Sequence, residues 1–194
     1  MISQIGSIAV SLAGGLIFSS FLFLGIYKKS NNEVYLQISE RAILASSYSI
    51  FLAFLCLLNE LLVSNFNLQY VAQYTSYETP VFFKVTALWA GQAGSLLFWS
   101  FITALFTVTY IFTTLRKMEK LKFHSYIIIS FIYSFFIILS SFIANPFEPV
   151  SSDIVVQNGN GLNPLLQNFF MAIHPPILYV GFTGSAIILS LIHI

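Results

Sequence analysis

The sequence of 194 residues contains a single cysteine, Cys56. One thiol cannot form an internal disulfide or a CxxC redox or metal motif. Because Cys56 lies within an apolar run, we interpret it as a small core side chain. The phosphate-binding glycine loop, the HExxH zinc motif and the GxSxG nucleophile motif are also absent from the sequence. These absences argue against the common chemistries of soluble enzymes.

Charged side chains are scarce, at 8% of the residues, whereas a soluble domain carries about 25%. Hydrophobic residues make up 57% of the chain, and its mean hydropathy is +0.85. A net charge of +1 offers no basic surface for nucleic acid, so we expect no nucleic-acid partner. The composition predicts an integral membrane protein in contact with lipid.

Several apolar stretches are long enough to cross a bilayer, for which a helix needs ~20 residues. Spans of this kind must be helical, because lipid offers no partner to backbone polar groups. We therefore predict an all-α fold class, a multispanning transmembrane helix bundle that forms a single membrane domain over 1–194. The predicted spans are 5–27, 43–64, 85–115, 126–144 and 175–194.

Basic residues gather in two of the connections between these spans. Lys28, Lys29 and Arg41 lie between the first two spans, and Arg116, Lys117, Lys120 and Lys122 lie between the third and fourth. By the positive-inside rule both connections are cytoplasmic, which predicts an extracytoplasmic N-terminus. The long connections 65–84 and 145–173 then lie outside, and Lys84 is the one basic residue there.

A histidine followed by two prolines, His174-Pro175-Pro176, precedes the last span on its outer side. Proline is tolerated in the first turn of a helix, so we predict that His174 caps a helix beginning at Pro175. Imidazole at this boundary suits an axial ligand of haem iron. It equally suits a capping or hydrogen-bonded interfacial histidine, and the residues alone leave both interpretations open.

The segment ALWAGQAGSLLFW of the third span combines small and aromatic residues. Gly91, Gly94 and Ser95 would form one small face, against which a helix or a flat ligand can approach closely. Trp89 and Trp99 flank this face, and indole rings suit a membrane interface or stacking on a porphyrin. By itself the segment favours helix packing over ligand binding.

Two further features of the outer side carry expectations. Glu60 lies near the outer end of the second span, and an intramembrane carboxylate is a functional candidate by default. We expect it to pair with Lys84 or a tyrosine, or to extend to the surface. Asn163 before Pro164 is typical of a helix cap, which predicts a short surface helix over 164–172.

Two strings, KVTALWAGQAGSLLFW (84–99) and GLNPLLQNFFMAIHPPILYVGF (161–182), resemble the CcmF family of cytochrome c-type biogenesis proteins, also called NrfE or CycK. The outer segment NFNLQYVAQYTS (65–76) fits the same family. This chain departs from the pattern at Ala90, where much of the family has glycine, and at Ala93, which is often acidic.

The resemblance implies a subunit of a haem lyase in the bacterial inner membrane, which transfers haem from a periplasmic haem chaperone to apocytochrome c together with other haem lyase subunits. It implies that His174 ligates the iron of a haem b. For a propionate of that haem, our own hypothesis is Lys84 as the partner. The other cofactor-binding positions that we associate with this site are Trp89, Gly91, Gly94, Ser95, Pro175 and Pro176.

Family members are longer than this chain, so we expect it to be an N-terminal fragment without the second axial ligand. Alone it should neither hold six-coordinate haem nor form thioethers. Two alternatives stay open. One is a channel or transporter module that uses Glu60 and the small-residue helix as a polar path, although transporters usually show more broken helices. The other is a structural membrane subunit in which His174 is only a cap.

Overall fold

The computed structural model describes residues 1–115, 121–151 and 156–192. These residues form helices joined by turns and loops, and no strand occurs among them. The helices are α1 (Ile2–Ser30), α2 (Glu33–Leu62), α3 (Gln69–Tyr74), α4 (Val81–Thr86), α5 (Gln92–Tyr110), α6 (Lys122–Ile138) and α7 (Phe169–Ile192). Five of them, counting the turns that continue α5 and α6, are long and apolar enough to span a membrane. The predicted all-α bundle of five spanning helices is confirmed.

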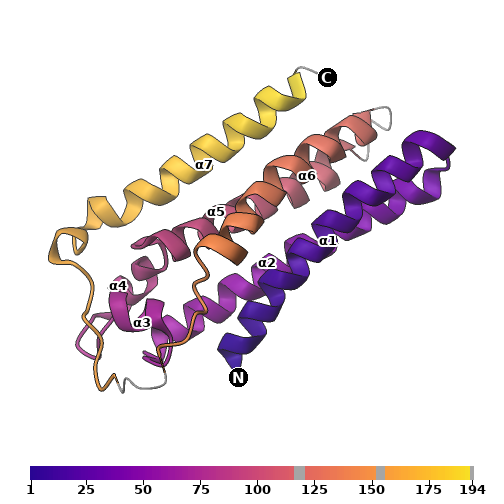
Figure 1. Cartoon of the computed structure of the whole chain (residues 1–194). Coiled ribbons are helices and arrows are strands. Elements are labelled where there is room, and N and C mark those ends of the chain that lie inside the picture. The colour runs from indigo at the N-terminus through magenta and orange to yellow at the C-terminus, as the bar shows by residue number, and fades with distance from the viewer. Residues whose placement is uncertain (116–120, 152–155, 193–194) are drawn as a thin grey trace.

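Helices α1 and α2 form a long antiparallel hairpin (Figure 1). Asn31 turns the chain in the left-handed conformation with φ 51°, and the Asn32 side chain caps α2 by accepting from Val34 N at 3.0 Å. Small residues allow the close packing of the hairpin, as where Ser46 Oγ donates to the carbonyl of Ala13 at 2.9 Å.

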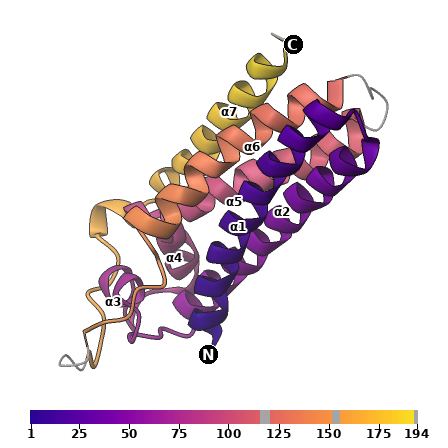
Figure 2. The same ribbon diagram turned by 45° about the vertical axis from the view of Figure 1, so that its right-hand side comes forward.

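Helices α5 and α6 pack against this hairpin and against each other, and α7 packs against α5 and α6 (Figure 2). Helix α5 contacts α2, helix α6 contacts α1, and α7 lies beside α5 at the edge of the bundle. In α7, 22% of the residues of the apolar window are buried, against 33–44% in the other four spans. One long face of α7 is therefore left uncovered by the described part of this chain.

The third span begins later than predicted, at Gln92, because the chain is interrupted before it. Helix α4 and a 3₁₀ turn, Ala87–Trp89, come first. Gly91 then takes an extended conformation, with φ −126° and ψ 166°, and the continuous helix follows. The segment 85–91 thus folds over the outer end of the bundle, where it can contact both α3 and α7.

The segment before the last span also differs from expectation. The Asn163 cap is present, with its side chain accepting from Leu165 N at 2.9 Å, but the helix that follows is a single 3₁₀ turn, Pro164–Leu166. Asn168 then starts α7, and its Oδ1 accepts from Phe170 N at 2.9 Å. The expected surface helix over 164–172 therefore ends after one turn, and 169–172 belong to the spanning helix.

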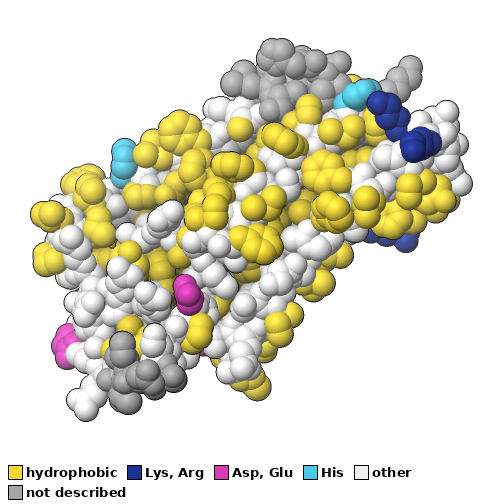
Figure 3. Space-filling view, viewed as in Figure 1, with side chains coloured by type: hydrophobic (Ala, Val, Ile, Leu, Met, Phe, Trp, Pro, Cys, Tyr) yellow, Lys and Arg dark blue, Asp and Glu magenta, His cyan; other side chains and the backbone are white. Residues whose placement is uncertain are grey.

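Charged side chains are distributed unevenly over the molecule (Figure 3). Lys28 and Lys29 end α1 and Lys122 begins α6, so these cations lie at the same end of the bundle. Figure 3 shows Lys and Arg at this end and Asp and Glu at the opposite end. Three cations of the second basic connection, Arg116, Lys117 and Lys120, lie outside the described residues.

Candidate functional site

His174 lies inside α7 and not at its cap, which corrects the prediction. The helix begins at Phe169, so His174 occupies its second turn and Pro175 and Pro176 follow within the helix. The sequence argument placed both prolines in a first turn because they cannot donate a helical hydrogen bond. Because the helix starts earlier, both prolines lie within it, where their missing N–H groups leave helical carbonyls without their usual donors.

The imidazole of His174 is exposed on the uncovered face of α7. Apolar side chains surround it on this face: Phe170 is 79% exposed, Ile177 64% and Leu178 40%. Within the described residues, no side chain hydrogen-bonds to the imidazole. Both ring nitrogens are therefore available to a group from outside this part of the chain.

Trp89 supplies the Ala172 carbonyl with a hydrogen-bond donor in place of the N–H that Pro176 lacks. Pro176 has no N–H, so the carbonyl of Ala172 lacks its usual donor four residues on, at a cost of ~3 kcal/mol for an unrelieved internal proline. The indole Nε1 of Trp89 donates to that carbonyl at 3.1 Å. A neighbouring segment thus satisfies the freed backbone group, as membrane helices that contain proline require.

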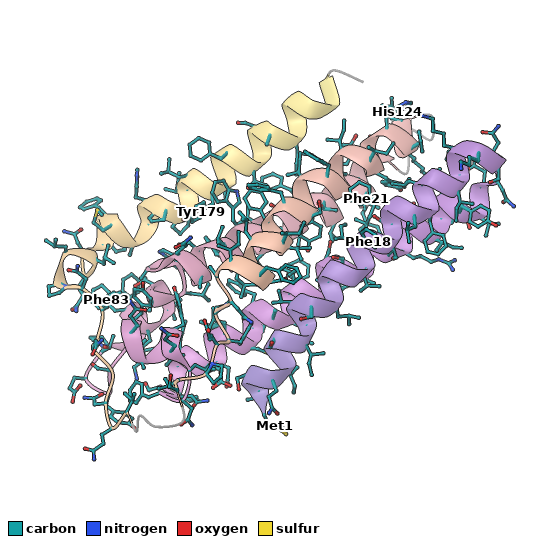
Figure 4. The ribbon with its side chains drawn as sticks, in the orientation of Figure 1. Met1, Phe18, Phe21, Phe83, His124 and Tyr179 are labelled. Carbon is teal, nitrogen blue, oxygen red and sulfur yellow. The ribbon has the colours of Figure 1, made fainter. Side chains whose placement is uncertain are left out.

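Both tryptophans face α7, but they bind it in different ways. Trp99 Nε1 donates to the side chain of Thr183 at 3.0 Å, whereas Trp89 binds the backbone. Tyr179 of α7 packs between α7 and α5, with its ring centroid 5.0 Å from that of Trp99 and 5.7 Å from that of Phe98 (Figure 4). These contacts make Tyr179 part of the packing between α5 and α7.

The small-residue segment faces tyrosine rings of the outer connection. A Cβ on Gly91 would overlap the ring of Tyr74, and a Cβ on Gly94 would overlap the hydroxyl of Tyr70 and the carbonyl of Leu88. Ser95 Oγ donates to the carbonyl of Trp89 at 2.9 Å. In this structure the two glycines accommodate the tyrosine rings of α3.

Tyr70 organises the start of α5, a role that the sequence analysis missed. Its hydroxyl accepts from Gly91 N at 3.1 Å and lies 2.9 Å from the carbonyl of Ala87 and 3.2 Å from that of Leu88, to which it donates. Burial raises the pKa of this hydroxyl well above its ordinary value, so it stays a donor. The sequence signal for this role is indirect. A tyrosine lies in the outer segment, and α5 starts at Gly91, which has no side chain that could cap the helix.

Glu60 and Lys84 belong to a buried cluster at the outer end of α2, which we call the outer polar cluster (Glu60, Ser64, Asn65 and Lys84). Glu60 is 3% exposed and its Oε2 accepts from Asn65 Nδ2 at 2.7 Å. Lys84 is 9% exposed and its Nζ donates to Ser64 Oγ at 2.6 Å. The carboxylate thus bonds neither of its expected partners, and the ammonium points into the protein, away from the propionate role expected of it.

Other metal-ligating side chains do not gather in the described part of the chain, where no group of three or more His, Cys, Asp or Glu could hold an ion. His124 is exposed at the start of α6, at the basic end of the bundle, and its ring contacts that of Phe123 (Figure 4). Of the two histidines that the structure describes, His174 is the one at the opposite end of the bundle, on the uncovered face of α7.

Comparisons with known proteins bear on this site. No protein-family model matches the chain. The chain is 35% identical to the cytochrome c-type biogenesis protein NrfE of Haemophilus influenzae over 125 residues, which cover 64% of this chain and 19% of that protein. It is 27% identical to CcmF of the same organism over 189 residues, covering 96% of this chain and 29% of that protein.

A solved structure, titled cytochrome c heme lyase CcmF, has the same fold. It aligns with a TM-score of 0.80 at 24% identity, over 96% of this chain and 29% of that one. These similarities confirm the resemblance to the CcmF, NrfE and CycK proteins. The chain spans less than a third of the length of the relatives it matches.

Proposed function

We propose that this chain, a homologue of the CcmF, NrfE and CycK cytochrome c-type biogenesis proteins, is a haem-binding membrane part of a haem lyase, with His174 as one axial ligand of a b-type haem. One observation supports this most: an exposed imidazole, to which no side chain of the described residues hydrogen-bonds, lies among exposed apolar side chains on the uncovered face of α7. An imidazole facing hydrocarbon is costly, which favours an occupant of this face that uses it.

The residues around His174 fit a haem on one side. Neutral imidazole supplies one axial ligand, and Phe170, Ile177 and Leu178 offer an apolar surface to the body of a macrocycle. Bound there, a haem would supply a redox-active iron. The ring nitrogen that does not bind iron needs a hydrogen-bond partner, and the second axial ligand must come from outside the described residues. We assign both to further chain or to partner subunits.

The remaining site residues take supporting roles in this proposal. Trp89, Pro175 and Pro176 shape the turn of α7 that carries the imidazole. Gly91, Gly94 and Ser95 lie under Tyr70, Tyr74 and the Trp89 carbonyl, so we leave them out of the haem contact surface. Because Glu60 and the glycines are packed within protein, a polar transport path finds no support in them.

Partners follow from the same proposal. We propose that haem reaches the site from a haem chaperone, that other haem lyase subunits complete it, and that apocytochrome c receives the haem.

The basic end of the bundle, with Lys28 and Lys29, would lie in the cytoplasm, and His174 would then lie near the outer face of a bacterial inner membrane. A cysteine at exposed Gln157 should then react with an impermeant maleimide added outside, and a cysteine at Lys29 should not.

An absorption spectrum of the full chain, purified in its native membrane assembly, tests the function. We expect b-type haem bands that are lost in His174→Ala, together with the yield of mature cytochrome c. His124→Ala is the matched control, because His124 is also exposed but lies at the basic end. Haem bands and cytochrome yield that are unchanged in His174→Ala would remove His174 from the site and overturn the proposal.

A further inference from the structure

The turn of α7 that carries His174 is attached to the rest of the bundle through its backbone. Ala172 lies two positions before His174, and its carbonyl accepts from Trp89 Nε1 at 3.1 Å. We propose that Trp89 is a positioning residue for His174, because its indole N–H replaces the helical donor that Pro176 lacks. This inference rests on the proposed function, in which His174 is a haem ligand.

The bond acts on the inner side of the turn. Ala172 is 3% exposed, whereas His174 is exposed, so the two residues lie on different faces of one helical turn. A helix turns about 100° per residue, which places side chains two positions apart on nearly opposite sides. The bond between Ala172 and the Ala87–Trp89 turn therefore fixes the rotation of α7 about its own axis, so that the His174 imidazole faces outward.

Trp89 is itself held on both sides. The Tyr70 hydroxyl bonds the carbonyls of Ala87 and Leu88 before it and the nitrogen of Gly91 after it. Ser95 Oγ binds the carbonyl of Trp89 itself at 2.9 Å. A series of hydrogen bonds thus runs from α3 through the 3₁₀ turn to α7, and the bonds of Tyr70 and of the Trp89 indole in it join segments that are distant in sequence.

The position of the second tryptophan makes the effect specific. Trp99 also donates to α7, but at Thr183, which lies about 16 Å further along the helix than Ala172 at 1.5 Å per residue. Loss of the Trp99 bond should loosen the second half of α7. Loss of the Trp89 bond should loosen the half that carries His174 and the two prolines.

The test compares Trp89→Phe with Trp99→Phe, since each variant keeps an aromatic ring and loses one N–H. Both are made in the full chain in its native membrane assembly. Hydrogen exchange followed by mass spectrometry should show amides of 169–178 exchanging about three- to tenfold faster in Trp89→Phe, as expected for one lost hydrogen bond. In Trp99→Phe, the faster exchange should fall in peptides around Thr183.

The haem spectrum gives the second measurement. Trp89→Phe should shift the haem absorption bands or the midpoint potential of the bound haem, and Trp99→Phe should leave both as in the wild type. Wild-type exchange and wild-type spectra in Trp89→Phe, or equal effects of the two variants on 169–178, would overturn the positioning role. A haem spectrum that survives in His174→Ala would instead overturn the ligand assignment, and faster exchange in Trp89→Phe would still show that Trp89 orders this turn.

Discussion

The hydroxyl of Tyr70 accepts a hydrogen bond from the backbone nitrogen of Gly91 at 3.1 Å and so caps α5 from a different helix. Helices usually start with a side chain that binds their free N–H groups, and glycine has none. A second glycine, Gly94, leaves the room that Tyr70 needs, because a Cβ there would overlap the tyrosine hydroxyl. The outer segment and the third span therefore fold as one unit.

Tyr70→Phe should destabilise the protein by about 1–3 kcal/mol, because it removes the acceptor of the buried Gly91 N–H and the hydroxyl donor to the Leu88 carbonyl, whereas the Ala87 carbonyl keeps Ala90 N as a donor. Thermal unfolding in detergent, followed by circular dichroism, measures the change. Tyr74→Phe is the control, since the Tyr74 ring packs on Gly91 while its hydroxyl forms no hydrogen bond with any residue that the structure describes. Equal midpoints for the two variants would contradict the capping role of Tyr70.

Gly94→Ala should be more damaging than Gly91→Ala. The added methyl at Gly94 meets a backbone carbonyl, that of Leu88, which cannot move without displacing the 3₁₀ turn, whereas at Gly91 it meets the end of the Tyr74 ring. Overpacking of this kind costs about 1–3 kcal/mol. Gly25→Ala meets no atom within 4 Å and should leave stability equal or up to about 1 kcal/mol higher. Unfolding midpoints of the three variants decide the order.

Ser64→Ala should cost more than the double variant Ser64→Ala with Lys84→Met. The single change leaves a buried ammonium without its acceptor, while the double change removes the charge as well. Breaking one partner of a buried polar pair is expensive, and replacing both by apolar groups can be nearly neutral. A double-mutant cycle on apparent unfolding free energies measures this, and simple additivity of the two single changes would count against the Lys84–Ser64 bond.

Glu78 should make the outer loops sensitive to acid. The Asn158 side-chain amide donates to this carboxylate at 3.0 Å and lowers the pKa of Glu78 below its ordinary value of 4.5. Because the pKa of Glu78 is lower in the folded state, its ionised carboxylate stabilises the fold fully above pH 4.5. This stabilisation is lost as the pH falls through the folded-state pKa. The protection factors of 156–161, which are exchange rates corrected for the intrinsic effect of pH, should fall in that range, and in Glu78→Gln they should stay constant.

The spanning helices follow directly from the sequence because their cause is local. Apolar runs such as 5–27 have the length that hydrocarbon requires, and every backbone hydrogen bond of a helix closes within the run. The Asn163 cap was also predictable, since a cap depends on neighbours two residues away. The interruption of the third span at Gly91 could not be predicted from the sequence, because it depends on Tyr70 and Tyr74 of another segment.

The sequence by itself determined a membrane protein of five apolar helices, with a histidine before two prolines that resembles one family of cytochrome c biogenesis proteins. Only the tertiary structure decided where α7 begins, which face presents His174, and what Glu60 and Lys84 bind. The physical reason is the range of the interactions. Hydropathy and caps act between neighbours in sequence. The donor that takes the place of the missing Pro176 N–H is the Trp89 indole, which lies 83 residues from the carbonyl that it binds.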